Sequence, residues 1–327
     1  MRPHVVTRRA SADDDSAVKE AARIIRRGGI VAFPTETVYG LGADAGNPEA
    51  AARIFEAKER PRFDPLIVHV PGKADALALA SVFPRTAHRI ADAFWPGPLT
   101  IVLPKRADRV PDIVTAGLPT VALRSPSHPA TRKLLAAAGC PIAAPSANRF
   151  GAVSPTTAEA VIEQLDGRID MVLDGGPCPI GVESTIVLCS GEKSALLRPG
   201  GLPLEEIEAV AGPLEAPPAS LIPQAPGSLP RHYAPRTPLF LVNGADEVPL
   251  EDRAGAAALL FAKRGISGFS TVKALSEHGD MREAAANLFS ALAQLDVAGT
   301  SAIYAERAPE TGLGRAINDR LKRASAR

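Results

Sequence analysis

Residues Phe33–Gly42 read FPTETVYGLG, and the prediction of the fold starts from them. A buried strand predicted over residues 30–33 leads into Thr35-Glu36-Thr37, and two close glycines follow. Such a strand end presents hydroxyl groups and free backbone amides at a sheet edge. Taken alone, the stretch also fits an ordinary turn with a threonine cap.

Three further segments are polar where a plain core would not be. Lys58–Leu66 (KERPRFDPL) has three cations within five positions at a predicted helix end, where cations can simply complement the helix dipole. Ala144–Arg149 (APSANR) follows a predicted buried strand, which suits a ligand crevice in an open α/β sheet. The last segment, Asp174–Gly201, contains GVESTIV and LRPGG. Each segment alone fits a loop, but the four together predict a binding site.

Predicted strands and helices alternate along the chain, with short loops marked by proline and glycine. Helices are predicted over residues 16–27, 48–58, 131–138, 157–165, 282–295 and 317–325. Strands are predicted over residues 30–33, 66–70, 99–103, 120–123, 141–144, 171–173, 185–188, 195–197, 239–242, 256–262 and 302–306. This alternation predicts an α/β fold with a mostly buried sheet. Some neighbouring strands have no helix between them, which indicates a mixed sheet.

The chain of 327 residues is long enough for two domains at roughly 150 residues each. Residues 213–238 are rich in proline and cannot form a central strand or a helix, so they are interpreted as an extended, semi-rigid linker. The predicted organisation is therefore a first domain over 1–212, a linker over 213–238 and a small α/β domain over 239–327.

The charge balance excludes several classes of protein. Lys and Arg number 37 and Asp and Glu 36, so the net charge is +1 and any anion site must be a local cluster. Aromatic residues form only 4% of the chain, which argues against a nucleic-acid groove built from stacking platforms. The three cysteines form no C-x-x-C pair, and six dispersed histidines without H-E-x-x-H predict no protein metal site.

No membrane or export segment is predicted. The N-terminus lacks the apolar stretch of a secretory signal, and no run of about 18 apolar residues occurs. The expectation is a soluble protein of the reducing cytoplasm, without membrane attachment.

Gly40–Ala45 (GLGADA) matches the loose dinucleotide-binding pattern G-x-G-x-x-A. That motif must join a strand end directly to a helix start, and here residues 34–39 and Asn47-Pro48 separate them. The chain contains no G-K-[ST] phosphate loop and no G-x-S-x-G hydrolase elbow. Nucleotide binding would therefore need a different kind of phosphate-binding site.

The polar segments resemble one family. PTETVYGLGADA, KERPRFDPLIVHV, FWPGPLTIVL, APSANRFGAVSPTTAEAV, GVESTIV and LLRPGG occur in the order and spacing of YrdC-like threonylcarbamoyl-AMP synthases. The sequence RHYAP at the end of the linker, with the extra domain, looks like the longer two-domain form. The resemblance is strong to about Gly201 and weak after Pro238. It implies a twisted mixed open sheet around a concave basic cavity, plus a small Rossmann-like α/β domain.

The resemblance implies that L-threonine, bicarbonate and ATP give L-threonylcarbamoyl-AMP and pyrophosphate, which is a nucleotidyltransferase reaction. Mg²⁺ would be bound through the ATP phosphates. The product would pass to tRNA-modifying transferase proteins, which form threonylcarbamoyladenosine beside the anticodon. The alternative is an RNA-binding module without catalysis, since the same basic cavity could bind a phosphate backbone, if only weakly. The near-neutral charge and few aromatics count against it.

The family's site residues fall on specific positions of this chain. The catalytic set implied by the resemblance is Lys58, Arg60, Ser146 and Asn148. The implied threonine site is Thr35, His69, Arg124, Ala144 and Ser184, with Arg124 the candidate partner of the carboxylate. The implied ATP site is Lys58, Arg62, Thr120, Ser146, Ser154, Arg198 and Tyr233. Alanine at Lys58 or Arg60 is expected to reduce adenylate formation greatly while leaving the fold intact; the alternative is a plain charge at a helix end, with wild-type activity in both variants.

Two positions depart from the family pattern. Asp64 stands where the family often has Asn, which adds a negative charge near the cations. The linker motif is altered over residues 227–233, which read GSLPRHY. Arg231, His232 and Tyr233 interrupt the proline run, and this segment is predicted to act as a lid over the cavity.

Overall fold

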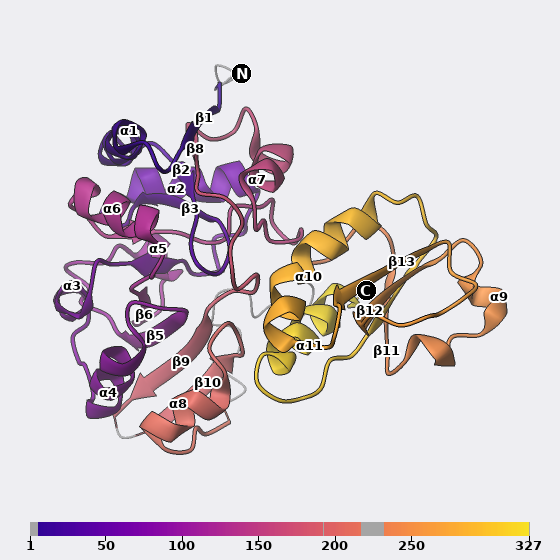
Figure 1. Cartoon of the computed structure of the whole chain (residues 1–327). Helices are drawn as coiled ribbons and strands as arrows, with labels where there is room; N and C mark the ends of the chain where they lie inside the picture. The colour runs from indigo at the N-terminus through magenta and orange to yellow at the C-terminus, as the bar shows by residue number, and fades with distance from the viewer. Residues whose placement is uncertain (1–5, 192, 217–231, 327) are drawn as a thin grey trace.

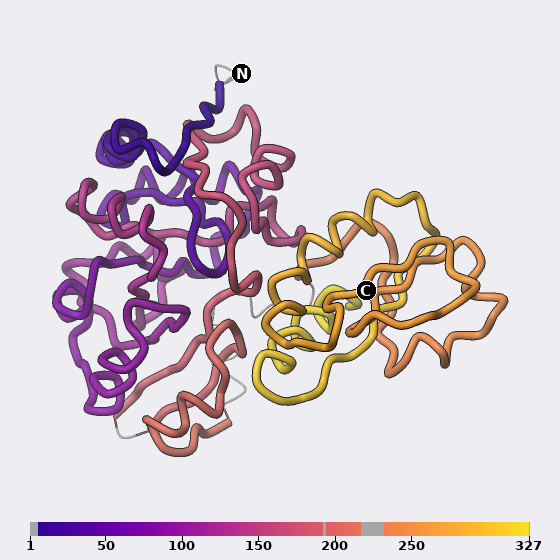
Figure 2. Tube along the Cα trace, viewed as in Figure 1, coloured from indigo at the N-terminus to yellow at the C-terminus, as the bar shows by residue number. Residues whose placement is uncertain are grey.

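The computed structural model describes residues 6–191, 193–216 and 232–326. Residues 6–216 form a larger body and residues 232–326 a smaller one beside it, as the trace in Figure 2 shows. Helices α10 (Met281–Asp296) and α11 (Gly314–Ala324) lie on the side of the smaller sheet that faces the larger body (Figure 1). Most of the predicted linker, including Arg231, lies outside the described residues.

The larger body is built on a mixed sheet, as predicted. In the described chain its ten strands follow the order β1-β8-β2-β3-β7-β4-β6-β5-β9-β10. The strands are β1 (Arg8–Ser11), β2 (Val31–Phe33), β3 (Gly40–Asp44), β4 (Ile67–His69), β5 (Leu99–Pro104), β6 (Thr120–Arg124), β7 (Ile142–Ala143), β8 (Met171–Asp174), β9 (Thr185–Ser190) and β10 (Lys193–Arg198). The sheet contains parallel pairs such as β4 and β6 as well as antiparallel pairs such as β5 and β6.

Helices cover both faces of this sheet. They are α1 (Asp15–Arg26), α2 (Pro48–Lys58), α3 (Lys73–Leu79), α4 (Arg85–Phe94), α5 (Asp112–Thr115), α6 (Pro129–Ala138), α7 (Ala158–Leu165) and α8 (Leu204–Ala211). Successive residues of a strand point to opposite faces. Val31 and Phe33 of β2 therefore join the core under α1 and α6, while Ala32 joins the core under α2, α4 and α7.

Local signals explain why α2 was predicted with its observed bounds. The side chain of Asn47 accepts hydrogen bonds from the backbone N–H groups of Glu49 and Ala50, and Pro48 occupies the first turn. The helix ends at Lys58, because Glu59 adopts a left-handed conformation with φ of 55°. This turn directs the next residues, including Arg60, back toward the sheet.

The glycine-rich stretch Gly40–Asp44 forms a strand, which the sequence analysis missed. It lies inside the sheet between β2 and β7, so Gly40-Leu41-Gly42 is not a phosphate loop at a helix start. A Cβ on Gly42 would lie 2.5 Å from the Phe33 ring and 2.6 Å from Ile142 Cγ2. The glycine at position 42 is therefore required by close packing. β1, β13, α3, α4, α5, α8 and the short helices of the smaller body were also not predicted.

The smaller body is a parallel four-stranded sheet in the order β11-β14-β12-β13. Its elements are β11 (Leu239–Val242), the 3-10 turn η2 (Ala245–Glu247), α9 (Leu250–Arg253), β12 (Ala257–Ala262), β13 (Thr271–Ser276), α10, β14 (Ile303–Glu306) and α11. Its apolar core also includes Val38 and Val182 of the larger body. The two bodies therefore share one packed core at their contact.

Among the described residues, none of the helices combines the length and the apolar run needed to cross a bilayer.

We expect Gly42→Ala to lower the free energy of unfolding by about 1–3 kcal/mol, because the added methyl group overpacks a closed core. Gly72→Ala is the matched control, since a Cβ at Gly72 meets nothing within 4 Å. Denaturant unfolding of both variants measures the difference. Equal stability of the two variants would contradict the packing argument.

Candidate active site

A cavity lies beside the ends of β4 and β6 and is closed by residues near the end of the predicted linker. Its wall is formed by Thr35, Val38, Gly40, Arg60, Ile67, His69, Arg124, Ala144, Pro145, Ser146, Glu183, Ser184, Arg198, His232 and Tyr233. The free space between these side chains is about 40 Å³. Ligand pockets for molecules of drug size enclose about 300–1,000 Å³, so a nucleotide cannot enter until part of the wall moves.

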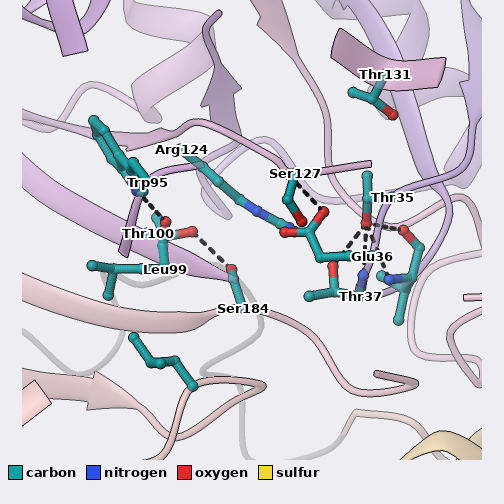
Figure 3. Close-up of polar contacts among 12 residues, drawn as sticks. Thr35, Glu36, Thr37, Trp95, Leu99, Thr100, Arg124, Ser127, Thr131 and Ser184 are labelled. Carbon is teal, nitrogen blue, oxygen red and sulfur yellow. Dashed lines mark hydrogen bonds and ion pairs between the residues drawn. The ribbon is translucent and has the colours of Figure 1, made fainter. Parts of the chain in front are cut away.

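Arg124 ends β6 and is held by a buried ion pair. Its Nη2 lies 2.6 Å from Oε1 of Glu36, and Oε2 of Glu36 accepts a hydrogen bond from the backbone N–H of Ser127 (Figure 3). Nε of Arg124 has no hydrogen-bond partner among the described residues. The guanidinium is thus fixed on one side and keeps a donor that a ligand in the cavity can use.

His69 ends β4 directly opposite Arg124 in the register of the two strands. Burial, with the neighbouring charge of Arg124, lowers the pKa of His69 to about 3, so the imidazole is neutral at physiological pH. Its ring packs edge-on against Phe33, and its Nδ1 is unpartnered in the described part of the chain. A neutral imidazole on this wall can exchange hydrogen bonds with a polar ligand without adding charge.

Thr35 and Ser184 place hydroxyl groups on the wall. The Thr35 hydroxyl donates to the carbonyl of Val38 at 2.6 Å, which fixes the loop between β2 and β3. The Ser184 hydroxyl lies 2.7 Å from that of Thr100, as Figure 3 shows. Arg198 donates from Nη2 to the Ser184 carbonyl at 2.9 Å. The end of β10 and the start of β9 are therefore tied together at the cavity.

Arg60 is paired with Asp64, the position that departs from the family pattern. Their Nη2 and Oδ2 atoms lie 2.8 Å apart in a fully buried setting, and the guanidinium also donates to the carbonyls of Asp64 and Pro65. Asp64 therefore fixes the loop and offsets the charge of Arg60 in this closed state.

Lys58 lies behind the wall rather than on it. Its ammonium donates to the carbonyls of Ser146 and Asn148, and so supports the loop after β7. Burial, with the charge of Arg60 nearby, lowers the pKa of Lys58 well below its ordinary value. The structure argues against the expectation that alanine here leaves the fold intact, because two buried carbonyls would lose their donor. The same holds for Arg60, whose loss would leave Asp64 buried without its cation.

Glu183 is the carboxylate of the wall and was given no role by the sequence analysis. Oε1 accepts from the hydroxyl of Ser154 at 2.7 Å, and Oε2 accepts from Nε of Arg320 at 2.8 Å. Burial alone would raise the pKa of Glu183, but the charges of Arg320 and Arg198 outweigh it and bring the value to about 2. The side chain is therefore ionised and fully engaged.

His232 and Tyr233 close the cavity. Tyr233 is fully buried, stacks on Phe289 of α10 with 5.4 Å between ring centroids, and lies 5.4 Å from the guanidinium of Arg320. The backbone N–H of Ala234 donates to the carbonyl of Gly151. The start of the segment 232–238 is therefore anchored on both bodies.

Most of the predicted site residues come together. Those on the cavity wall are Thr35, Arg60, His69, Arg124, Ala144, Ser146, Ser184, Arg198 and Tyr233. Lys58, Asn148 and Ser154 lie buried behind it. Arg62 is exposed, and Thr120 opens β6 about 13 Å along the strand from Arg124, so neither lies at the cavity as it stands.

Sequence reasoning gave no role to Glu36, Thr100, Glu183 and Arg320. Three of them stand inside the quoted segments FPTETVYGLG, FWPGPLTIVL and GVESTIV, so a search for their partners within the motifs could have found them. Arg320 carried no comparable signal. Arg320 lies 137 positions from Glu183, in a helix with several other cations.

In the described ranges no three His, Cys, Asp or Glu side chains are grouped so that they could hold a metal ion.

Comparisons with known proteins agree with the arrangement of the two bodies. Residues 23–200 match the model of the Sua5/YciO/YrdC family, described as telomere recombination. Residues 202–326 match the model of the threonylcarbamoyl-AMP synthase C-terminal domain. The chain belongs to the Sua5/YciO/YrdC family.

Full-length relatives narrow this assignment. The threonylcarbamoyl-AMP synthase of Bacillus subtilis is 42% identical, with 95% of this chain and 94% of that protein covered. That of Pyrococcus abyssi is 45% identical, with 94% of each covered. The crystal structure of P. abyssi Sua5 complexed with L-threonine is 41% identical, covers 98% of this chain and 97% of its own, and superposes with a TM-score of 0.89. Within the family, the chain is therefore one of the two-domain threonylcarbamoyl-AMP synthases.

We expect Lys58→Ala to lower the free energy of unfolding by about 2 kcal/mol, because the carbonyls of Ser146 and Asn148 stay buried without a donor. Lys105→Ala is the matched control, since that ammonium binds Asp112, which is exposed, and Thr115. Thermal and denaturant unfolding compare the two variants. A Lys58→Ala protein as stable as Lys105→Ala would show that Lys58 is a plain charge at a helix end.

Proposed function

We propose that this cavity joins L-threonine, bicarbonate and ATP to give L-threonylcarbamoyl-AMP and pyrophosphate, a nucleotidyltransferase reaction. The observation that carries the proposal is the presence of three buried arginines, Arg60, Arg124 and Arg198, on one small wall of a nearly neutral protein. All three substrates carry an anionic group, and arginine binds carboxylate and phosphate groups through paired donors. The relative complexed with L-threonine supports the same assignment.

The residues divide into two groups around the cavity. Thr35, His69, Arg124, Ala144 and Ser184 would hold threonine, with Arg124 at its carboxylate. Lys58, Arg60, Ser146 and Asn148 would hold the triphosphate and the carbamoyl intermediate. Arg62, Thr120, Ser154, Arg198 and Tyr233 complete the proposed ATP site, for which Arg62 and Thr120 would have to approach.

The reaction needs no protein nucleophile. The threonine amine attacks bicarbonate, with loss of water, or CO₂, with loss of a proton. An oxygen of the resulting carbamate then attacks the α-phosphorus in line and expels pyrophosphate. The chain positions the reactants and stabilises the developing charge, which is the larger part of catalysis in phosphoryl chemistry.

Mg²⁺ would reach the site with ATP. Glu183 is the carboxylate among the residues of the cavity wall, and both its oxygens are engaged by Ser154 and Arg320. The donor set therefore fits an ion held by the substrate's phosphates, where it would neutralise charge on the leaving pyrophosphate.

The product is proposed to serve threonylcarbamoylation of tRNA. It would pass to tRNA-modifying transferase proteins in the cytoplasm, where the tRNA substrate is found. We also propose that the first domain ends at residue 212 and that the second begins after residue 238.

The reaction is tested by measuring pyrophosphate release from Mg-ATP by the purified full chain. Release should require threonine and bicarbonate together, because the carbamate forms only from both. Serine should replace threonine better than valine does. Valine lacks the hydroxyl group and would leave buried polar groups of the site without a hydrogen-bond partner. Serine lacks only a methyl group, whose loss costs about 1–3 kcal/mol of binding free energy. Release that is indifferent to threonine would overturn the proposed function.

The segment 232–238 is proposed to act as a lid. In the closed state described here it leaves too little space for a nucleotide. A closed site would protect a carbamoyl-adenylate, which water hydrolyses. The buried Tyr233 hydroxyl has no hydrogen-bond partner among the described residues, which leaves it available to a bound nucleotide.

We expect Tyr233→Ala to make adenylate that escapes or hydrolyses faster than that of the wild type, because the ring no longer packs between Phe289 and Arg320. Tyr233→Phe is the matched control, since it keeps the ring and removes only the hydroxyl. The measurement is the ratio of protein-bound adenylate to free AMP after one turnover. A ratio in Tyr233→Ala equal to that of the wild type would show that the segment is only a spacer.

A further inference from the structure

Arg320 is a fully buried cation in the last helix of the chain, outside the family motifs that identify the site. Its Nε donates to Oε2 of Glu183 at 2.8 Å, and its Nη1 donates to the carbonyl of Pro199 at 2.8 Å. Nη1 also donates to Oδ2 of Asp319, its neighbour in α11, at 2.7 Å. The side chain of Arg320, in the smaller body, therefore contacts two loops of the larger body.

Both of these loops carry cavity residues. Glu183 directly precedes Ser184, and Pro199 directly follows Arg198. The two loops are in backbone contact, since the N–H of Gly201 donates to the Glu183 carbonyl at 2.8 Å. A Cβ on Gly200 would overlap the backbone of residues 183–185. Arg320 therefore joins, from behind, the two loops that carry Ser184 and Arg198.

The same guanidinium supports a third part of the wall. It lies 5.4 Å from the ring centroid of Tyr233, whose ring also stacks on Phe289. Nearby, Gly181 leaves no room for a Cβ against the backbone of Ala285 and Ala286 in α10. The loop before β9 is thus fitted directly to the helices of the smaller body.

Charge makes this contact specific. Glu183 is buried and ionised, and an ionised carboxylate in such a place needs a cation with hydrogen-bond geometry. A guanidinium presents its donors on separate nitrogens in a fixed plane, so Nε binds Glu183 while Nη1 binds the Pro199 carbonyl; an ammonium, with all its donors on one nitrogen, does not reproduce this geometry.

We propose that Arg320 is a positioning residue for the threonine side of the cavity, so that the site is complete only when the smaller body is docked through it. This inference rests on the proposed function for the identity of the ligand. The geometry of the clamp can be tested without it.

Arg253 provides a matched control in the same body. It too is buried, and its guanidinium donates to the carbonyls of Asp246, Val248 and Ser267 and lies over the ring of Phe269. All of these partners belong to the smaller body. Arg253→Met therefore removes a comparable set of contacts without touching the cavity.

The first measurement is hydrogen exchange of the ligand-free full chain. Arg320→Met should raise exchange at least tenfold in peptides covering residues 183–201, and Arg253→Met should leave those peptides within twofold of the wild type. Equal protection of residues 183–201 in both variants would overturn the clamp, whatever reaction the protein catalyses.

The second measurement is steady-state kinetics with threonine as the varied substrate. Arg320→Met should raise the threonine KM at least tenfold, with a smaller change in kcat, whereas Arg253→Met should leave KM within twofold. Arg320→Lys should recover part of the loss, because it keeps the charge but can hold only one of the two loops well. Equal KM values in Arg320→Met and Arg253→Met would refute the positioning role.

The double variant Glu183→Gln/Arg320→Met tests the same inference if Arg320→Met alone folds poorly. It removes the orphaned buried charge, so its stability should exceed that of Arg320→Met, while the threonine KM should stay raised because the loops remain unclamped. A wild-type KM in this double variant would overturn the inference. A wild-type enzyme that shows no threonine dependence would instead overturn the proposed function and leave the exchange result to decide the clamp.

Discussion

Buried carboxylates hold the cations of this site in place. Glu36 fixes Arg124, Asp64 fixes Arg60, and Glu183 binds Arg320, each through an ion pair shielded from water. Without these ion pairs, the arginines around the cavity would be mobile and would repel one another. Pairing these three arginines with buried carboxylates lowers that repulsion and orients the donors before any ligand arrives. The paired residues lie after β2, after α2, at the end of β6, before β9 and in α11, so the fold gathers them at or behind the cavity wall.

The smaller body is part of this arrangement and not an appendage to it. Its core takes in Val38 and Val182, and its helix α11 supplies Arg320 to Glu183. A shared apolar core shields the contact between the bodies from water. In such surroundings the ion pair between Arg320 and Glu183 needs good geometry, and removing one of its partners is strongly destabilising. The position of the smaller body therefore affects the loop that carries Ser184.

Elements with strong local signals could be predicted from the sequence, and those set by tertiary packing could not. The helix Pro48–Lys58 has its cap, its proline and its apolar period within a dozen residues. The strand Gly40–Asp44 has none of these signals, because its glycines are selected by the ring of Phe33 lying across it. In the site, motif residues such as Ser146 and Ser184 were identified, since they belong to contiguous segments. Arg320 was not, because its role exists only through a contact with Glu183 that folding creates.

The side chain of Arg320 takes part both in closing the cavity and in positioning its wall. Tyr233 closes the cavity and packs against Arg320, while Arg320 binds the carboxylate that precedes Ser184. Opening the segment 232–238 to admit a nucleotide would remove an aromatic ring from the guanidinium, but it would leave the ion pair to Glu183 and the hydrogen bond to Pro199 unbroken. If the segment moves as the proposed lid, the rest of the wall can therefore keep its shape. Substrates would then enter a site that is already arranged, and the ring would return to a surface that has not changed.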